Sequence, residues 1–272
     1  MELADGKDQE FQARRRKCGG CGMTGMLASV ASLDEARIVL AGGADVIDLK
    51  DPSQGALGAV ATDLMRQVVS LVKRQCLVSA TVGDLPMERD IVLPAVSNTA
   101  ATGVDIVKVG FFAQHIGRDL LNGLRLEAHQ GVRIVAVLFA DIGFRLSTLS
   151  RLADVGVWGV MVDTAQKAKG SLRERISDDV LLQFVQEARA CRLVCGLAGS
   201  LRSDDIVPLL ALEPDYLGFR GALCTGELRT AGLDEEAVAA IRARIREACG
   251  RPLGLRGADG RLGAFERSMA YP

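Results

Sequence analysis

The stretch "ADVIDLKDPSQGALG" (44–58) places two charges at the end of an apolar run, directly before a turn rich in proline and glycine. The run itself, 45–50, has the length and composition of a strand in a parallel sheet that is buried on both faces. Because strand side chains alternate between two faces, Asp48 and Lys50 share a face with Val46. The stretch therefore predicts a buried strand that carries charged groups to its carboxyl end.

Similar apolar runs recur along the chain and alternate with segments of helical spacing. The other predicted strands are 26–31, 77–83, 105–110, 133–141, 159–164, 193–200 and 216–222. Amphipathic segments include 32–44, 62–74, 177–191 and 233–250. Eight such units within roughly 225 residues predict an α/β fold, a TIM (β/α)8 barrel. The alternative is a doubly wound open sheet, but no GxGxxG motif follows the first predicted strand.

The domain organisation follows from where this pattern begins and ends. In this chain of 272 residues, we expect an N-terminal extension over 1–25 that is disordered, the barrel over 26–249, and a loosely ordered tail over 250–272. The net charge of -1 disfavours a broad nucleic-acid surface. No apolar run reaches the roughly 18 residues of a membrane helix, so we expect no membrane association.

Most of the seven cysteines lie in apolar segments, which is typical of reduced thiols in a cytoplasmic protein. "CGGC" (18–21) is a single CxxC motif without a second ligand pair, and the only histidines, His115 and His129, are distant in sequence. We therefore expect no metal and no cofactor. We also expect a homo-oligomer.

Lysine is scarce in this sequence. Only seven of the 33 basic residues are lysines; the rest are arginines. Arginine stays protonated and cannot act as an amine nucleophile, whereas lysine can do so when its pKa is lowered. A lysine at a strand end is therefore a candidate for chemistry that arginine cannot perform.

Several charged residues are predicted to converge at the carboxyl ends of the strands, where TIM barrels carry their active sites. Strand periodicity points Asp48, Lys50, Lys108 and Asp163 into the barrel, with Asp141 and Lys167 at the rim. A buried salt-bridge layer is the alternative interpretation, but burying several charges is costly. Clustered lysines depress each other's pKa, which favours Schiff-base formation with an aldehyde or ketone. Spacing alone leaves Lys50, Lys108 and Lys167 as equal candidates for the nucleophile.

The last two predicted strands end in glycine-rich turns. These turns contain Gly199 and Ser200 after the seventh strand, and Arg220 and Gly221 after the eighth. Loops at these positions commonly bind phosphate through backbone N–H groups, and Arg220 would add a charged donor. We therefore expect a small phosphorylated aldehyde or ketone as substrate. The segment 225–234 that follows is a long loop or a lid, and the sequence does not decide between the two.

These motifs, in this order, resemble the (5-formylfuran-3-yl)methyl phosphate synthase family, also called 4-(hydroxymethyl)-2-furancarboxaldehyde-phosphate synthase. The matching stretches are "GGADVIDLKDPSQGALGA" (42–59), "SATVGDLP" (79–86), "DIVKVG" (105–110), "VMVDTAQKAKGSL" (160–172), "LAGSL" (197–201) and "RGALC" (220–224). The resemblance covers about residues 26–235. It departs at Asp51, where asparagine is expected, and at "FADIGF" (139–144), which leaves the acid/base role of Asp141 loosely defined.

The resemblance implies a lyase with a TIM barrel of class I aldolase type. Such an enzyme condenses two molecules of glyceraldehyde 3-phosphate, with loss of phosphate and water, in the biosynthesis of methanofuran or an analogue used in one-carbon metabolism. It also implies that Lys167 forms the Schiff base and that Asp48, Lys50, Lys108 and Asp163 are the other essential residues. Two alternatives stay open: another Schiff-base aldolase acting on triose phosphates, and a non-catalytic barrel that binds phosphorylated sugars.

Overall fold

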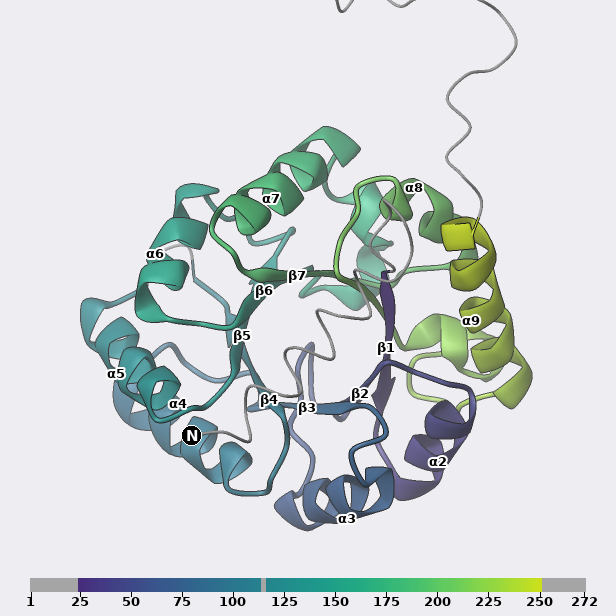
Figure 1. Ribbon diagram of the computed structural model, residues 1–272, viewed down its shortest axis with the longest axis horizontal. Helices are drawn as coiled ribbons and strands as arrows, with labels where there is room; N and C mark the ends of the chain where they lie inside the picture. The colour runs from purple at the N-terminus through teal and green to yellow at the C-terminus, as the bar shows by residue number, and fades with distance from the viewer. Residues whose placement is uncertain (1–23, 114–115, 251–272) are drawn as a thin grey trace, which may run out of the picture.

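The protein is a closed barrel of parallel strands surrounded by helices, as the computed structural model shows end-on (Figure 1). The structure describes residues 24–113 and 116–250. The strands are β1 (Gly25–Val30), β2 (Val46–Leu49), β3 (Leu77–Thr81), β4 (Ile106–Phe111), β5 (Ile134–Phe139), β6 (Gly159–Asp163), β7 (Val194–Leu197) and β8 (Tyr216–Phe219). The barrel closes because β8 pairs in parallel with β1. The expected TIM barrel is confirmed.

The helices form the outer layer. They are α2 (Leu33–Ala41), α3 (Thr62–Val72), α4 (Arg89–Ala100), α5 (Arg118–His129), α6 (Ser147–Val155), α7 (Asp178–Ala190), α8 (Ile206–Leu210) and α9 (Glu235–Gly250). Helices α2 to α8 lie between consecutive strands, and α9 follows β8. Single-turn 3₁₀ helices follow the later strands: η1 (Lys167–Lys169), η2 (Leu172–Glu174), η3 (Ser203–Asp205), η4 (Gly221–Leu223) and η5 (Thr225–Glu227). The regular elements therefore run from Gly25 to Gly250, and the CGGC motif lies outside the described residues.

Two apolar layers hold the barrel together, one on each face of the sheet. Outward-facing strand residues such as Ile47 and Val107 pack with the inner faces of the helices. Inward-facing residues such as Val46, Ile106 and Met161 form a second cluster inside the barrel. Residues of each strand therefore alternate between the two clusters, as expected from strand geometry. Burial on both faces explains why the strands appear in the sequence as almost uninterrupted apolar runs.

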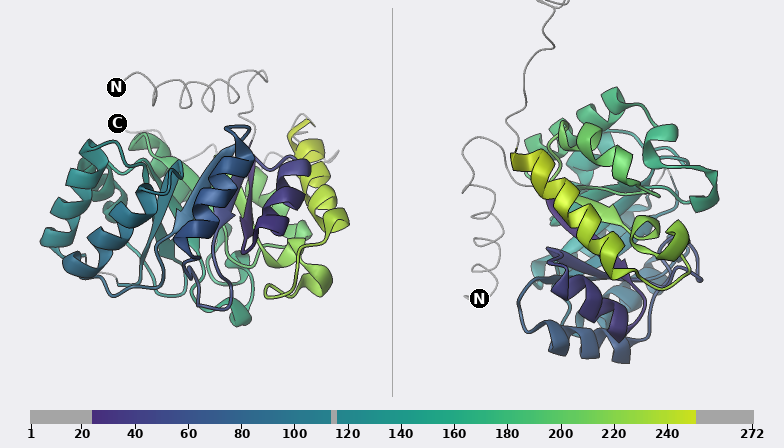
Figure 2. Two further views of the ribbon diagram at one scale, coloured as in Figure 1. Left: turned by 90° about the horizontal axis from the view of Figure 1, so that it is seen from below. Right: turned by 90° about the vertical axis from the view of Figure 1, so that its right-hand side faces the viewer.

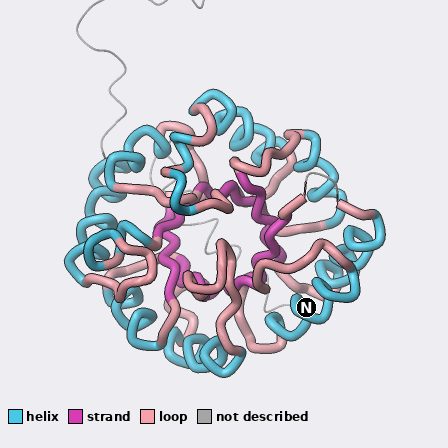
Figure 3. Tube along the Cα trace, turned by 180° about the vertical axis from the view of Figure 1, so that it is seen from behind, coloured by secondary structure: helices cyan, strands magenta, loops and turns pink. Residues whose placement is uncertain are grey.

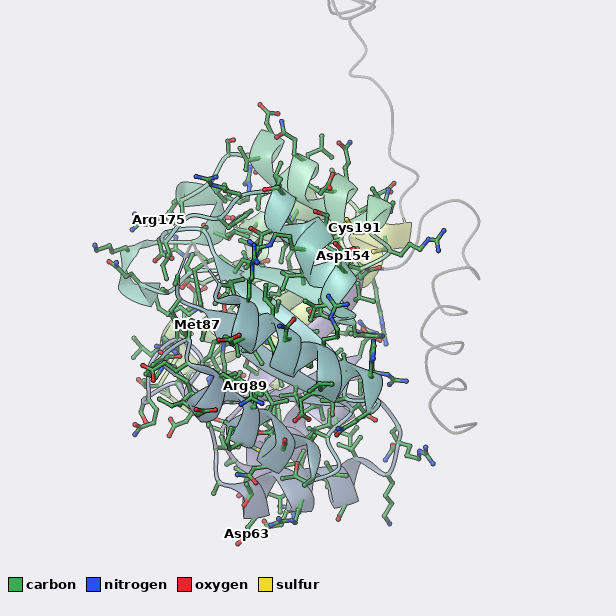
Figure 4. The ribbon with its side chains drawn as sticks, turned by 90° about the vertical axis from the view of Figure 1, so that its left-hand side faces the viewer. Asp63, Met87, Arg89, Asp154, Arg175 and Cys191 are labelled. Atoms are coloured by element: carbon green, nitrogen blue, oxygen red, sulfur yellow. The ribbon has the colours of Figure 1, made fainter. Side chains whose placement is uncertain are left out.

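Charged side chains cover the outside of the helical layer. Asp63 and Arg89 lie on this outer surface in the side view with side chains drawn (Figure 4). Both are largely exposed, and their ion pairs with neighbours on the same helix contribute little to stability. The charged residues predicted for the site lie elsewhere, and Lys50, Lys108, Asp163 and Lys167 line a cavity within the barrel.

The carboxyl ends of the strands form one face of the barrel. In the left view of Figure 2, the yellow-green segment that follows β8 lies at the lower edge, and α9 returns from it to the upper edge. Seen from behind, the strands form an inner ring, with loops extending inward from the helical layer (Figure 3). Each predicted strand overlaps an observed one, but Lys50 and Arg220 lie one residue beyond β2 and β8. Both side chains therefore belong to the loops of this face.

Candidate active site

A cavity of about 430 Å³ lies within the barrel at the carboxyl ends of the strands. A cavity of this size is sufficient for small phosphorylated metabolites. Eight of the residues predicted for the site line it: Lys50, Lys108, Asp163, Lys167, Gly199, Ser200, Arg220 and Gly221. The inward orientation predicted from strand periodicity therefore brings residues from distant parts of the sequence to one place.

Asp48 and Lys108 form a fully buried ion pair at the base of the site. Lys108 Nζ donates a hydrogen bond to Asp48 Oδ2 at 3.0 Å, and the side chains are 2% and 0% exposed. The hydroxyls of Ser29 and Ser79 also donate to Asp48, at 3.1 and 2.6 Å. Burial alone would raise the pKa of Asp48, but Lys108, Lys50 and these hydrogen bonds hold it below its ordinary value. Asp48 is therefore a fixed anion that orients Lys108.

Asp163 at the end of β6 faces two lysines. Lys167 Nζ donates a hydrogen bond to Oδ1, while Lys50 Nζ lies 4.0 Å from Oδ2. The backbone N–H of Thr164 also donates to Oδ1, at 2.7 Å. Burial would raise the pKa of Asp163, but the two lysines and these hydrogen bonds keep it below its ordinary value. The carboxylate is therefore ionised at neutral pH and lies between two amines.

The two amines that flank Asp163 differ in how firmly they hold a proton. Burial lowers the pKa of Lys50 from 10.5 to about 8, although Asp163 opposes the shift. Burial also lowers the pKa of Lys167, but this amine is both paired and hydrogen-bonded to Asp163, which favours the protonated form. Because the Lys50 contact is longer than a hydrogen bond, Lys50 releases its proton more readily than an ordinary lysine.

Residues of the loops after β7 and β8 also line the cavity, among them Gly199, Ser200 and Gly221. Gly199 adopts a φ of +119°, and a Cβ there would lie 3.0 Å from Thr164, so glycine is required at this turn. Within the described parts of the chain, the N–H groups of Ser200 and Gly221 donate to no protein acceptor. Free amides at the edge of a cavity are suited to binding an anion such as phosphate.

Arg220 lines the cavity, but its guanidinium is occupied by protein acceptors, which argues against the predicted contact with phosphate. It pairs with the Glu35 carboxylate at 2.5 and 3.0 Å, and it donates to the carbonyl oxygen of Ser29 at 3.2 Å. Two further bonds reach the carbonyl oxygens of Arg229 and Ala231, at 2.8 and 3.0 Å. All five N–H groups of an arginine are then used. Arg220 therefore fixes the loop after β8.

Asp141 is also engaged away from the cavity, so the acid/base role expected for it is not supported. Its two oxygens accept the backbone N–H groups of Ala165 and Gln166, at 2.8 and 2.7 Å. It is absent from the residues that line the cavity. These bonds position the segment that leads from β6 to Lys167.

Sequence comparison now places this site in a family. The family model for 4-HFC-P synthase matches residues 26–242, which include every residue of the site described above. The chain belongs to the 4-HFC-P synthase family. A (5-formylfuran-3-yl)methyl phosphate synthase from Methanocaldococcus jannaschii is 32% identical over 80% of this chain and 97% of the relative. A Methylorubrum extorquens protein, named provisionally for the same activity, is 40% identical over 81% of this chain and 93% of its own length.

Members of the 4-HFC-P synthase family are enzymes, and this membership confirms the family predicted from the motifs. Solved structures agree on the fold alone. A phosphoribosyl anthranilate isomerase from Thermus thermophilus has a TM-score of 0.59 at 15% identity and covers 82% of this chain and 99% of its own. A 3-hexulose-6-phosphate synthase matches equally well, with a TM-score of 0.59 at 16% identity, and covers 81% of this chain and 99% of its own.

Residues 24–113 and 116–250 lack both a cluster of metal-ligating side chains and a membrane-spanning helix. These residues contain no group of three or more His, Cys, Asp or Glu side chains arranged to hold a metal ion. Within the same ranges, no helix has both the length and the apolar character needed to cross a membrane.

Sequence reasoning missed two features of the site. The serines that hold Asp48, Ser29 and Ser79, lie opposite Asp48 on the neighbouring strands. Their inward parity was the signal that could have identified them. The second is Arg229, which lines the cavity from a loop without a regular repeat. A loop residue of this kind cannot be oriented from periodicity.

Proposed function

We propose that this chain is a lyase that joins two molecules of glyceraldehyde 3-phosphate into (5-formylfuran-3-yl)methyl phosphate, in the biosynthesis of methanofuran or an analogue. One inorganic phosphate and two molecules of water leave, which balances the atoms. The observation that carries the proposal is the buried Lys50 amine, with its pKa lowered to about 8, in a cavity that also presents free backbone amides. The family membership supports the same substrate and product.

The geometry favours Lys50 over Lys167 as the amine that forms the Schiff base. A nucleophilic lysine must lose its proton before it attacks a carbonyl carbon. Lys167 is hydrogen-bonded to Asp163, whereas Lys50 lies 4.0 Å from this carboxylate. Lys50 therefore reaches the neutral form more easily, and Lys167, which the family resemblance indicated, becomes the second candidate.

The reaction would begin when the Lys50 nitrogen attacks the aldehyde carbon of one substrate molecule. A C–N bond forms, the carbonyl oxygen leaves as water, and the resulting iminium acidifies the neighbouring C–H bond. Asp163 and Lys167 lie beside this amine and are suited to moving the protons of both steps. Loss of the C–H proton then forms a C–C double bond to the next carbon, and the phosphate on that carbon departs with the electron pair of its C–O bond.

The buried pair of Asp48 and Lys108 would support this chemistry as an electrostatic frame. Three lysines and two aspartates meet here: Lys50, Lys108, Lys167, Asp48 and Asp163. The resulting excess of positive charge suits a phosphorylated, anionic substrate. The free amides of Ser200 and Gly221 would hold one phosphate group.

The proposal is tested by incubating the purified protein with glyceraldehyde 3-phosphate and following furan absorbance together with release of inorganic phosphate. Another aldolase acting on triose phosphates would form a Schiff base without a furan, and a binding protein would give neither. Addition of borohydride should trap the substrate on one lysine, which peptide mapping identifies. The matched control is Lys169→Met, since Lys169 lies in η1 beside Lys167 but does not line the cavity.

A further inference from the structure

Arg229 reaches the cavity from the loop between β8 and α9. The residue is half-buried, and its guanidinium donates a hydrogen bond to the carbonyl oxygen of Gly55 at 2.9 Å. Gly55 belongs to the loop after β2, which begins at Lys50, so the arginine links the loop after β8 to the loop that carries Lys50. No other hydrogen bond from this guanidinium is found within residues 24–113 and 116–250. Most of its N–H groups therefore remain available to a ligand.

Both ends of this link are held in place by buried or partly buried contacts. On one side, Arg220 donates to the carbonyl oxygens of Arg229 and Ala231, and Glu35 fixes the Arg220 guanidinium. An isolated antiparallel β-bridge between Cys224 and Leu233 closes the base of the same loop. The Arg229 backbone is therefore positioned before any substrate binds.

The other side of the link is held by Asp84. Its carboxylate accepts the backbone N–H groups of Ala56 and Leu57, at 2.8 and 2.7 Å. Gly55 has a φ of +105°, and a Cβ there would lie 2.1 Å from Asp84 Oδ2. Only glycine fits between the carboxylate and the turn, so the acceptor for Arg229 is also fixed.

The proposed reaction, on which this inference rests, brings two phosphate groups into one cavity. The amides of Ser200 and Gly221 provide for one of them. The three lysines face carboxylates or serve the carbonyl chemistry, and Arg220 has no free N–H group. Arg202 also lines the cavity, but its side chain is 61% exposed. Arg229 is thus the cation that combines partial burial with free donors.

We propose that Arg229 binds the phosphate of the second triose phosphate, at a position distinct from the backbone amides of the β7 and β8 loops. The planar fork of an arginine forms paired hydrogen bonds with phosphate oxygens. In contact with this phosphate, Arg229 neutralises negative charge that would otherwise cause two anionic substrate molecules to repel each other. It also stabilises a departing phosphate if that group is the one it holds.

The test measures binding of glycerol 3-phosphate by calorimetry, because this analogue carries the phosphate but no carbonyl group. The wild-type chain is expected to bind two molecules, and Arg229→Gln one, with the other site unchanged. Arg229→Lys keeps the charge without the fork and should weaken the second site on the order of 10–100-fold, as expected for lost charged hydrogen bonds. Arg202→Gln is the matched control and should keep both sites.

A wild-type chain that binds a single molecule would overturn the inference, as would two unchanged sites in Arg229→Gln. Thermal unfolding of each variant checks the fold, and Arg229→Lys carries the test if Arg229→Gln is unstable. The binding result and the proposed function can fail separately: two sites without furan formation would reject the synthase reaction while leaving phosphate binding by Arg229 intact. Furan formation with a single phosphate site would do the reverse.

Discussion

Lys50 Nζ lies 4.0 Å from Asp163 Oδ2, although both side chains are buried. A buried ammonium group normally gains a close carboxylate partner with hydrogen bonds, because desolvation of an unpaired charge is costly. Here Lys167, not Lys50, donates the hydrogen bond to the Asp163 carboxylate. The consequence is a lysine that is poorly stabilised as a cation, which is the property that a Schiff-base nucleophile needs.

Replacement of Lys50 by methionine should abolish covalent trapping of glyceraldehyde 3-phosphate by borohydride. Furan formation should fall by ~10³-fold or more, because the covalent route is lost. Lys167→Met should keep a trappable adduct and lose activity by ~10²–10⁴-fold, as for a proton-transfer group. Mass spectrometry of the trapped protein separates the two outcomes. An adduct that survives in Lys50→Met and disappears in Lys167→Met would reverse the assignment.

The pH dependence of the reaction should report the Lys50 amine. Its pKa of about 8 means that most molecules carry a protonated amine at pH 7, and the neutral fraction rises with pH. We expect kcat/KM to rise about tenfold per pH unit below this pKa and to level off above it. Initial rates of furan formation from pH 6 to 9.5 measure the profile. A rate that is flat between pH 6.5 and 8.5 would contradict this role of Lys50.

The strand ends could be predicted because two simple rules combine there. Alternation of side chains sets which residues face inward, and parallel pairing brings all carboxyl ends to one face. These rules placed Lys108 and Asp163 correctly, as the inner cluster around Ile106 and Met161 shows. They need only local sequence, so they apply without knowledge of the partners.

The contacts that corrected the prediction are not local. Arg220 forms an ion pair with Glu35, which lies 185 positions away in the sequence, and no local pattern around either residue predicts this pair. An arginine beside a glycine turn fits a phosphate contact and a structural ion pair equally well. Asp141 likewise accepts hydrogen bonds from backbone amides that lie 24 and 25 positions away in the sequence. Such contacts depend on how loops fold over the barrel, which side-chain periodicity does not encode.

The buried lysines should have opposite effects on stability. Lys50→Met removes a poorly paired buried charge, and we expect it to raise the free energy of unfolding by about 1–3 kcal/mol at pH 6.5. The gain should shrink above pH 8, because the folded protein then releases the Lys50 proton while the unfolded chain retains its own until about pH 10.

The contrasting variant is Lys108→Met. It leaves Asp48, which is 0% exposed, without its ion-pair partner, and should cost about 3–5 kcal/mol. Urea unfolding of both variants at pH 6.5 and 9 measures the difference. Equal destabilisation of the two would show that the Lys50 amine is as well paired as that of Lys108.

Gly55 and Gly83 form a natural comparison for the loop that Arg229 contacts. Both have nearly the same positive φ, +105° and +103°. A Cβ at Gly55 would lie 2.1 Å from Asp84, whereas the nearest atoms at Gly83 are 3.7 Å away. Gly55→Ala should therefore displace Asp84 and raise KM on the order of 10-fold relative to Gly83→Ala. The backbone strain of ~1 kcal/mol is common to both variants and does not account for this difference. Similar KM values for Gly55→Ala and Gly83→Ala would contradict the role of this contact.

Asp141→Asn tests whether this residue positions Lys167 or transfers protons. The amide retains one acceptor oxygen, so one of the two bonds to the backbone N–H groups of Ala165 and Gln166 is lost. If Asp141 is a positioning residue, its substitution should lower kcat by about 10-fold through a small displacement of Lys167, with the pH profile unchanged. If Asp141 transferred protons, its substitution would instead remove one limb of the pH–rate profile. Because Asp141 lies outside the cavity lining, we expect the first result, and Asp141→Ala should deepen the loss in kcat without shifting the apparent pKa.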